Sequence, residues 1–258
     1  QRRSRQRATS PPAAHPALIA YQAPKWLPGG HLQTIYPLLI KPVAQPYRRQ
    51  RWETPDRDFI DLDWNENAAC AADNPQTPLV VLFHGLEGSS NSQYARALMQ
   101  RLTAVGWGGV VIHFRGCSGE PNRLPRAYHS GDSEEIEWIL QRLKQQHPQR
   151  TLYAAGVSLG GNALLKWLGE RESAATRYIS AAAAISAPHD LAACGHQLAR
   201  GFNRVYTQHF LKTLKQGAAA KLLRFPGLFD ERRMREAANL YQFDDVVTGP
   251  LHGFAGAN

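Results

Sequence analysis

The sequence lacks any long hydrophobic segment and holds little cysteine. No uninterrupted apolar run approaches the roughly 20 residues that a transmembrane helix needs, and the longest strand-like block covers only 79–83. The amino-terminal residues also lack the apolar stretch of a secretory signal. The cysteines, Cys70, Cys117 and Cys194, are too widely spaced for a CxxC redox or zinc motif. We therefore expect a cytoplasmic protein with free thiols, no metal site and no transmembrane segment.

Acidic residues are absent from the first 51 positions, which carry nine lysines and arginines. Positions 52–258 hold 21 basic and 21 acidic side chains, so the whole net charge of +9 comes from the amino-terminal region. A neutral body is poorly suited to a groove that follows nucleic-acid phosphates. We expect a basic, flexible leader at 1–24, one domain at 25–258 and no nucleic-acid partner. A leader that binds RNA or acidic lipid is the alternative interpretation of this charge.

Strand patterns alternate with helical patterns from position 59 onward. Strands are predicted at 59–64, 79–83, 109–114, 151–157 and 178–186, and helices at 92–105, 132–146 and 159–169. Such alternation is typical of an α/β fold, in which a mostly parallel sheet is flanked by helices on both faces. Residues of about 190–248 show helical patterns without a convincing strand, which predicts a lid over the carboxyl ends of the strands.

Three local expectations add detail to this fold. The segment 59–64 alternates apolar and acidic residues, which predicts a half-exposed strand. Asp132 followed by Glu135 has the spacing of a capping box at a helix start. Four prolines in the segment 26–51 predict an irregular arm without a long helix.

The segment Gly156–Asn162 places a serine, Ser158, where a predicted strand turns directly into a predicted helix. The pattern is G-x-S-x-G, which at a strand–helix junction indicates a nucleophile elbow. The turn is so sharp that side chains two residues either side of the serine would collide. Glycine at Gly156 and Gly160 removes that collision. We therefore predict that Ser158 is the catalytic nucleophile.

A second motif, His84–Ser90, follows the first buried strand. A loop at this position can turn a backbone N–H towards the nucleophile, so we predict an oxyanion hole made by the amides of Leu86 and Leu159. His84 lies under the loop, and we interpret it as a side chain that holds the loop rather than as a general base. Ser118 is a rival nucleophile by residue type, but its spacing favours a tight turn.

Six sequence blocks occur together in one order: Pro28–Thr34, His84–Ser90, Phe114–Gly119, Tyr128–Asp132, Gly156–Asn162 and Asp244–Thr248. In these blocks the chain resembles the α/β-hydrolase superfamily, and within it the YheT-like, abhydrolase-domain branch. That branch is related to eukaryotic abhydrolase-domain lipases and to yeast ethanol acyltransferases. The resemblance implies an esterase or lipase-like acyl hydrolase with a Ser–Asp–His triad.

The resemblance also implies two further strands after the lid, which lead to the triad acid and histidine. The chain ends at Asn258, so we expect a truncated hydrolase that lacks its last strands and these two residues. Asp244 or Asp245 with His252 would satisfy the order of the triad. Their separation is too small for two different strand ends, and we reject them as triad members. The open sheet edge that truncation leaves should favour aggregation.

The predicted function is hydrolysis of a small-molecule carboxylic ester through an acyl-enzyme on Ser158. Water releases the acyl group, or an alcohol does so in an acyl transfer. This chemistry needs neither a metal nor a cofactor. A non-catalytic binding module on a truncated hydrolase fold is the alternative, and the oligomeric state is left open.

Overall fold

The computed structural model describes residues 22–40, 42–65 and 76–257. Most of the predicted leader, and Cys70, lie outside these residues. The chain divides into two compact units, Gln1–Lys41 and Pro42–Asn258, which are described separately. In the first unit, helix α1 (Gly29–Leu39) is short and contains Pro37, consistent with the proline content of this segment. None of its side chains is buried.

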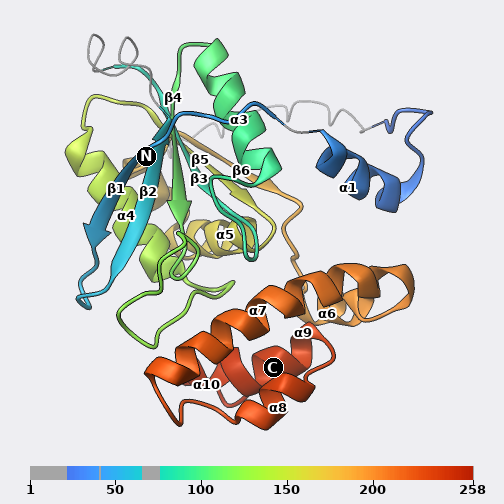
Figure 1. Ribbon diagram of the computed structural model, residues 1–258. Helices are drawn as coiled ribbons and strands as arrows, with labels where there is room; N and C mark the ends of the chain where they lie inside the picture. Colours follow the sequence, from blue (N-terminus) through green and yellow to red (C-terminus); the bar gives the residue numbers. More distant parts are fainter. Residues whose placement is uncertain (1–21, 41, 66–75, 258) are drawn as a thin grey trace, which may run out of the picture. The chain divides into compact units, whose positions relative to one another are not determined.

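The second unit is built on a six-stranded sheet with the order β1-β2-β4-β3-β5-β6 (Figure 1). β1 pairs antiparallel with β2, and β2 antiparallel with β4, whereas the other neighbours are parallel. The strands are β1 (Arg48–Glu53), β2 (Phe59–Asn65), β3 (Leu79–Phe83), β4 (Gly108–His113), β5 (Leu152–Val157) and β6 (Ala181–Ile185). The mixed, mostly parallel sheet confirms the predicted fold class.

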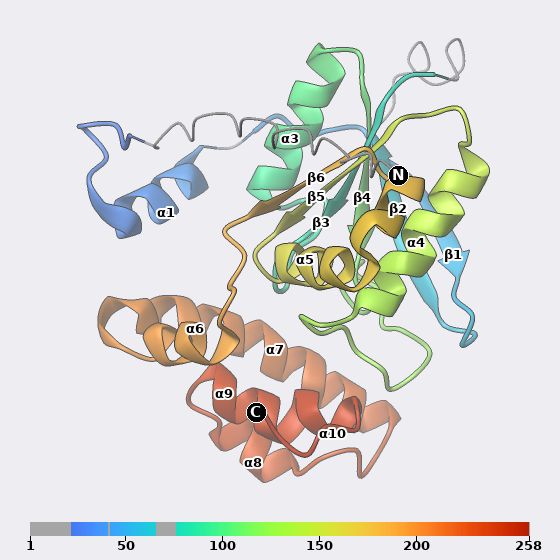
Figure 2. The ribbon, with the colours of Figure 1, turned by 180° about the vertical axis from the view of Figure 1, so that it is seen from behind.

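Helices cover both faces of this sheet, as Figures 1 and 2 show. On one face, Met99 of α3 (Gln93–Ala104) packs against buried side chains of β3 and β4. On the other face, α4 (Ser133–Gln146) and α5 (Leu159–Arg171) bury Ile139 and Trp167 in the larger core cluster. The short helix η1 (Glu172–Arg177) follows α5.

β2 corrects one sequence prediction, because all of its residues are buried rather than every second one. Its acidic residues face β1, a strand that the sequence pattern did not predict. Arg51 pairs with Asp61 at 2.8 Å and Arg49 pairs with Asp63 at 2.8 Å. The acidic positions therefore do not mark a solvent face: the arginines of the neighbouring strand cover them.

The start of α4 corrects another prediction. Asp132 occupies the N-cap position, but its side chain makes no cap hydrogen bond. Its carboxylate instead accepts a hydrogen bond from Arg126 at 2.8 Å, and Glu135 accepts one from Arg115 at 2.7 Å. Both carboxylates of the predicted capping box therefore bind arginine side chains, and neither caps the helix backbone.

The described elements after β6 are all helical (Figure 2), as the sequence pattern of about 190–248 predicted. The elements are α6 (Leu191–Leu198), η2 (Gly201–Asn203), α7 (Arg204–Arg224), α8 (Glu231–Glu236), α9 (Leu240–Phe243), the π-helical η3 (Asp244–Thr248) and α10 (Gly249–Leu251). They share a small core of their own around Leu211 and Phe243. Lys221 and Arg224 of α7 tie them to the loop after β4 by donating to the carbonyl oxygens of Pro125 and Asn122.

No helix among the described residues is both long and apolar enough to cross a bilayer. The outer strand β6 pairs with β5 and has exposed side chains along its whole length. Within the described chain it has no second strand partner.

Candidate functional site

Ser158 lies in the turn between β5 and α5, where the sequence predicted it. Its backbone has φ 51° and ψ −115°, a conformation that side chains rarely adopt. A Cβ atom at Gly156 would lie 2.5 Å from the Gly160 carbonyl oxygen, and one at Gly160 would lie 2.4 Å from the Phe83 carbonyl oxygen. Only glycine fits at either position, so these glycines permit the sharp turn that exposes the serine.

The loop after β3 lies against this turn. A Cβ atom at Gly85 would be 3.4 Å from the Cβ of Ser158, and one at Gly160 would be 2.5 Å from the carbonyl oxygen of His84. The backbone of His84 and Gly85 therefore lies against the turn that carries Ser158. This proximity is the geometric condition for a loop amide to act on a group bound at the serine.

Most amides of the loop that follows β3 already donate to an acceptor. Two of these amides donate to tyrosine hydroxyls, Gly85 N–H to Tyr94 at 2.8 Å and Glu87 N–H to Tyr128 at 2.9 Å. The amide of Gly88 donates to the Gly85 carbonyl at 2.9 Å, and the amide of Ser89 donates to Ser92 Oγ at 3.0 Å. Among the described residues, none accepts a hydrogen bond from the Leu86 amide. Leu86 therefore retains a free donor in the loop that lies against the Ser158 turn.

His84 fixes the direction of that donor. Its Nδ1 lies 2.7 Å from the carbonyl oxygen of Gly85, and its Nε2 lies 3.1 Å from the amide nitrogen of Phe114. A carbonyl only accepts and an amide N–H only donates, so Nδ1 carries the proton and Nε2 is the acceptor. Because a trans peptide is planar, holding the Gly85 carbonyl also orients the Leu86 N–H on the opposite side.

These contacts also argue against His84 as a base. The ring is completely buried, and this desolvation lowers its pKa to about 3. Both ring nitrogens already have partners. The role of His84 in holding the loop, which the sequence suggested, is confirmed.

Leu159 supplies a second amide at the same turn. It is the first residue of α5, so its N–H has no carbonyl of its own helix to bind. Ser158 is the N-cap residue, and its side chain makes no cap hydrogen bond. The positive end of the α5 helix dipole therefore lies at the serine, and the serine side chain does not occupy the first amides of the helix.

A separate buried cluster anchors the far end of the loop. Asp63 Oδ2 accepts hydrogen bonds from Ser90 Oγ at 2.6 Å and from His113 Nε2 at 2.8 Å. Burial alone would raise the pKa of Asp63, but its hydrogen bonds with Arg49, His113 and Ser90 outweigh that and lower it. Although the cluster contains Ser, His and Asp, Ser90 is buried and donates directly to the acid. It is a structural brace.

The rejected triad candidates lie among the helices after β6. Asp244 accepts from Thr248 at 2.6 Å, and Asp245 pairs with Arg233 at 3.3 Å. The ring of His252 lies 4.4 Å from that of His129, and burial with the neighbouring His129 lowers its pKa to about 4. The two aspartates thus bond within the helical segment, whereas His252 packs against the loop after β4 and its Nε2 is buried without a partner among the described residues.

Ser118, the rival nucleophile, lies in a bend directly after the tight turn that the Cys117 amide closes on the Phe114 carbonyl. The flanking glycines, Gly116 and Gly119, have φ of 83° and 94°. The Ser118 carbonyl accepts a hydrogen bond from Arg49 at 2.7 Å.

One histidine that the sequence analysis did not single out lies near the Ser158 turn. The segment before it packs on α5, because Asn162 Nδ2 donates to the carbonyl oxygen of Pro188. His189 follows directly and is exposed. Its sequence context, between two predicted elements, carries no motif that would have marked it.

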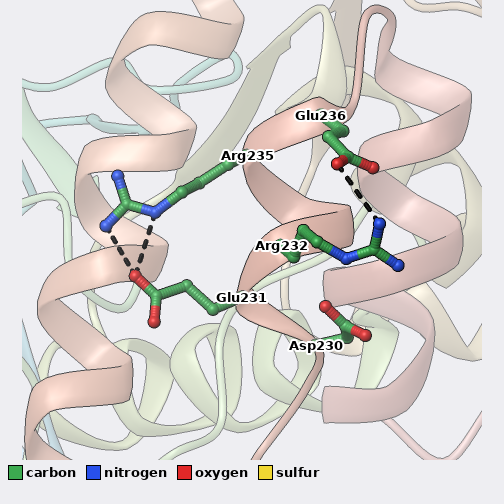
Figure 3. A pocket seen from close by; sticks show the side chains of 5 residues that line it. All are labelled: Asp230, Glu231, Arg232, Arg235 and Glu236. Atoms are coloured by element: carbon green, nitrogen blue, oxygen red, sulfur yellow. Dashed lines mark hydrogen bonds and ion pairs between the residues drawn. The ribbon is translucent and has the colours of Figure 1, made fainter.

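The hollow shown in Figure 3 is not part of this site. It lies on α8 and is lined by charged residues that pair with one another, Glu231 with Arg235 and Arg232 with Glu236. None of its lining residues belongs to the turn or to the loop after β3. Among the described residues, no group of three or more His, Cys, Asp or Glu side chains could hold a metal ion.

The two described cysteines, Cys117 and Cys194, are free thiols. Burial raises the pKa of Cys117 to about 12. This thiol therefore stays protonated and is a poor nucleophile.

Comparison with known proteins agrees with this geometry. Residues 78–242 match the family of the alpha/beta hydrolase fold. YheT of Escherichia coli, a candidate esterase by its name, is 43% identical over 88% of this chain and 66% of its own length. Human phospholipase ABHD3 is 30% identical over 91% of this chain and 58% of its own. A monoacylglycerol lipase of Saccharomyces cerevisiae is 28% identical over 84% of this chain and 48% of its own.

The chain thus spans between about half and two-thirds of the length of these relatives. The family match covers more than half of the chain, and it includes β3, the turn at Ser158 and most of the helices after β6. The chain belongs to the α/β-hydrolase family and is similar to YheT and to the abhydrolase-domain relatives named above.

Proposed function

We propose that Ser158 is the nucleophile of a carboxylic ester hydrolase and that the amides of Leu86 and Leu159 form its oxyanion hole. The observation that carries this proposal is the turn itself. A serine at φ 51° stands between two glycines that no other residue could replace, beside a loop amide without a partner. Structural serines do not need such an arrangement.

The reaction would proceed by attack of the Ser158 hydroxyl oxygen on the ester carbonyl carbon. The serine proton passes to a general base, and the carbonyl oxygen takes up negative charge between the amides of Leu86 and Leu159. The carbon–oxygen bond to the alcohol then breaks, and the alcohol leaves with a proton. Water attacks the acyl-enzyme in the same way and releases the acid, or an alcohol forms a new ester.

We further propose that the described residues do not supply the acid and base of a complete triad. His84 and His113 are buried and bonded through both ring nitrogens. Asp244 and Asp245 bond to residues of the helices after β6, and the ring of His252 packs against that of His129 in the loop after β4. The chain of 258 residues should therefore turn over simple esters slowly.

The substrate class follows from the lid and from the relatives. A helical segment with an apolar core follows β6, which suits an ester with an apolar acyl chain. The relatives named as phospholipase and monoacylglycerol lipase act on such esters by name. We propose an acyl ester of this kind, with no metal or cofactor.

A binding module that holds such an ester without cleaving it is the second candidate. His84 and His113 are both hydrogen-bonded inside the core, which favours this candidate. A protein whose nucleophile lacks a general base would bind the ester but react with it slowly. It predicts ligand binding with no covalent adduct.

A fluorophosphonate probe separates the two candidates, because it reacts with activated serines. We expect weak but specific labelling that disappears in Ser158→Ala and persists in the matched control Ser118→Ala. Labelling that survives Ser158→Ala would move the nucleophile elsewhere. Absence of labelling in the unmodified chain, together with ester binding, would favour the binding module.

A further inference from the structure

We propose that Tyr128 is a positioning residue for the oxyanion hole, acting by clamping Glu87 and thereby setting the direction of the Leu86 amide. The inference rests on the proposed function of Ser158 and Leu86. The hydroxyl of Tyr128 accepts a hydrogen bond from the backbone N–H of Glu87 at 2.9 Å. It also donates to the carboxylate of the same residue at 3.0 Å. One phenol thus holds both the main chain and the side chain of one loop residue.

The conformation of Glu87 explains why the loop needs such a clamp. Its φ is 55°, in the left-handed region that residues with a side chain avoid. Gly88 follows directly, but the strained position itself is not glycine. A residue held at positive φ without glycine relaxes unless its surroundings fix it. The two hydrogen bonds to Tyr128 supply that restraint.

The clamp acts on the peptide next to the proposed oxyanion donor. The Leu86 N–H belongs to the peptide between Gly85 and Leu86. The peptide before it is held through the Gly85 N–H by Tyr94, and the peptide after it through the Glu87 N–H by Tyr128. Release of either neighbour would let the Leu86 N–H swing away from Ser158. Tyr128 holds the side of the loop that carries the strained residue.

Tyr128 is itself held rigidly. Its ring stacks on that of Phe114, with centroids 5.2 Å apart and planes 5° apart. Phe114 is buried, and its amide binds His84, which orients the Gly85 carbonyl. His84 and Tyr128, which both position the Leu86 amide, therefore both contact Phe114 at the end of β4.

The chemistry of the phenol suits a permanent clamp. Burial raises the pKa of Tyr128 well above its ordinary value, so the hydroxyl keeps its proton across the working range. The neighbouring thiol of Cys117 interacts with the same hydroxyl and also stays protonated. The donor to Glu87 is thus present at every pH at which an esterase would operate.

The test compares Tyr128→Phe with Tyr178→Phe in the full chain. Tyr128→Phe keeps the ring stacked on Phe114 and removes only the hydroxyl. Tyr178→Phe is the matched control, because its hydroxyl binds the carboxylate of Glu137 away from the loop. The readouts are the second-order rate of Ser158 labelling by a fluorophosphonate and the melting temperature.

We expect Tyr128→Phe to slow labelling by about 10-fold to 100-fold, less than or comparable to the loss of a whole oxyanion donor. Tyr178→Phe should label at the rate of the unmodified chain, and both variants should melt within a few degrees of each other. Equal labelling rates in the two variants would overturn the proposal. Failure of the unmodified chain to label at all would instead contradict the proposed nucleophile, a different and recognisable result.

A rescue experiment separates positioning from a general structural role. Glycine adopts positive φ without strain, so Glu87→Gly in the Tyr128→Phe background should recover part of the lost labelling rate. A loop damaged in some other way gains nothing from this change. A double variant that labels as slowly as Tyr128→Phe alone would contradict the clamp.

Discussion

The centre of the sheet and its β6 margin are built in opposite ways. Around β5, the turn at Ser158 and the loop after β3 are in such close contact that two glycines cannot accept a single added carbon. One strand further out, the side chains of β6 are exposed from Ala181 to Ile185 and carry no charge. The turn at Ser158 is therefore tightly packed, whereas the side chains of β6 are exposed and only its backbone is held, by pairing with β5.

The opposite edge of the sheet, formed by β1, differs from both of these regions. β1 is also an outer strand, but Arg49 and Arg51 cover it and pair with the acids of β2. Charged side chains of this kind discourage the addition of a foreign strand. The tendency of an outer strand to pair with a foreign strand therefore depends on whether its side chains are charged, and not on its exposure alone. The three regions accordingly give different predictions.

The largest effect should come from a single methyl group in the crowded centre. Gly160→Ala would place a Cβ atom 2.4 Å from the Phe83 carbonyl oxygen, a backbone atom that cannot move aside. We expect a loss of about 3 kcal/mol or more in the free energy of unfolding and no labelling of Ser158. Urea denaturation and fluorophosphonate labelling measure both.

Gly169→Ala in the same helix is the matched control. Nothing lies within 4 Å of a Cβ atom there. The change should stabilise the protein by about 0.5–1 kcal/mol, since alanine favours the helix. Equal effects of the two substitutions would mean that the turn is not crowded.

The next largest change in stability should come from the buried Asp63 cluster that holds Ser90 at the end of the loop. Asp63→Asn removes a buried carboxylate that pairs with the partly exposed Arg49 and accepts a hydrogen bond from the buried His113. We expect a loss of about 3 kcal/mol in stability, as for other broken buried pairs. Asp245→Asn, which breaks an exposed pair with Arg233, should cost less than about 1 kcal/mol. Comparable losses in the two variants would deny that the brace stabilises the centre.

An effect that is smaller for each pH unit should appear as a pH dependence of stability. His84 has a folded pKa of about 3, below its ordinary value because it is buried. Between roughly pH 6.5 and that value, the unfolded chain binds a proton that the folded chain refuses. Stability should therefore fall on acidification by about 1.4 kcal/mol per pH unit from this residue. The slope of unfolding free energy against pH measures it, and His84→Asn should remove that share. An unchanged slope in the variant would show that His84 does not stay neutral.

The smallest effect on folding should come from the β6 margin. Ala183→Lys places a charge on an exposed strand, so the free energy of unfolding should stay within about 0.5 kcal/mol. The same change should reduce aggregation and binding of the dye ANS, because charge blocks edge-to-edge pairing. Gln100→Lys on the exposed side of α3 adds the same charge elsewhere and serves as the control. Equal sedimentation behaviour of both variants would show that β6 is not the aggregation edge.

Local patterns predicted the centre of the fold well. The order of strands and helices and the turn at Ser158 depend on residues close in sequence, and glycine at Gly156 and Gly160 had a steric reason that the distances bear out. The role of His84 followed from its place at the end of a strand.

Interactions between distant residues were not visible in the sequence. The arginines of β1 cover Asp61 and Asp63, so a pattern typical of a half-exposed strand belongs to a buried one. Tyr128 lies 41 residues from Glu87, and no local signal marks it as a clamp. Prediction failed where the partner comes from another element and depends on the completed fold.

The most direct test of the central account is to locate a covalent adduct on the chain. The protein is incubated with a fluorophosphonate and digested, and the modified peptide is identified by mass spectrometry. We expect one adduct per chain, on Ser158 in the peptide that joins β5 to α5, with its yield reduced in Tyr128→Phe. An adduct on another serine, or an unmodified Ser158 after prolonged exposure of the folded chain, would contradict the account.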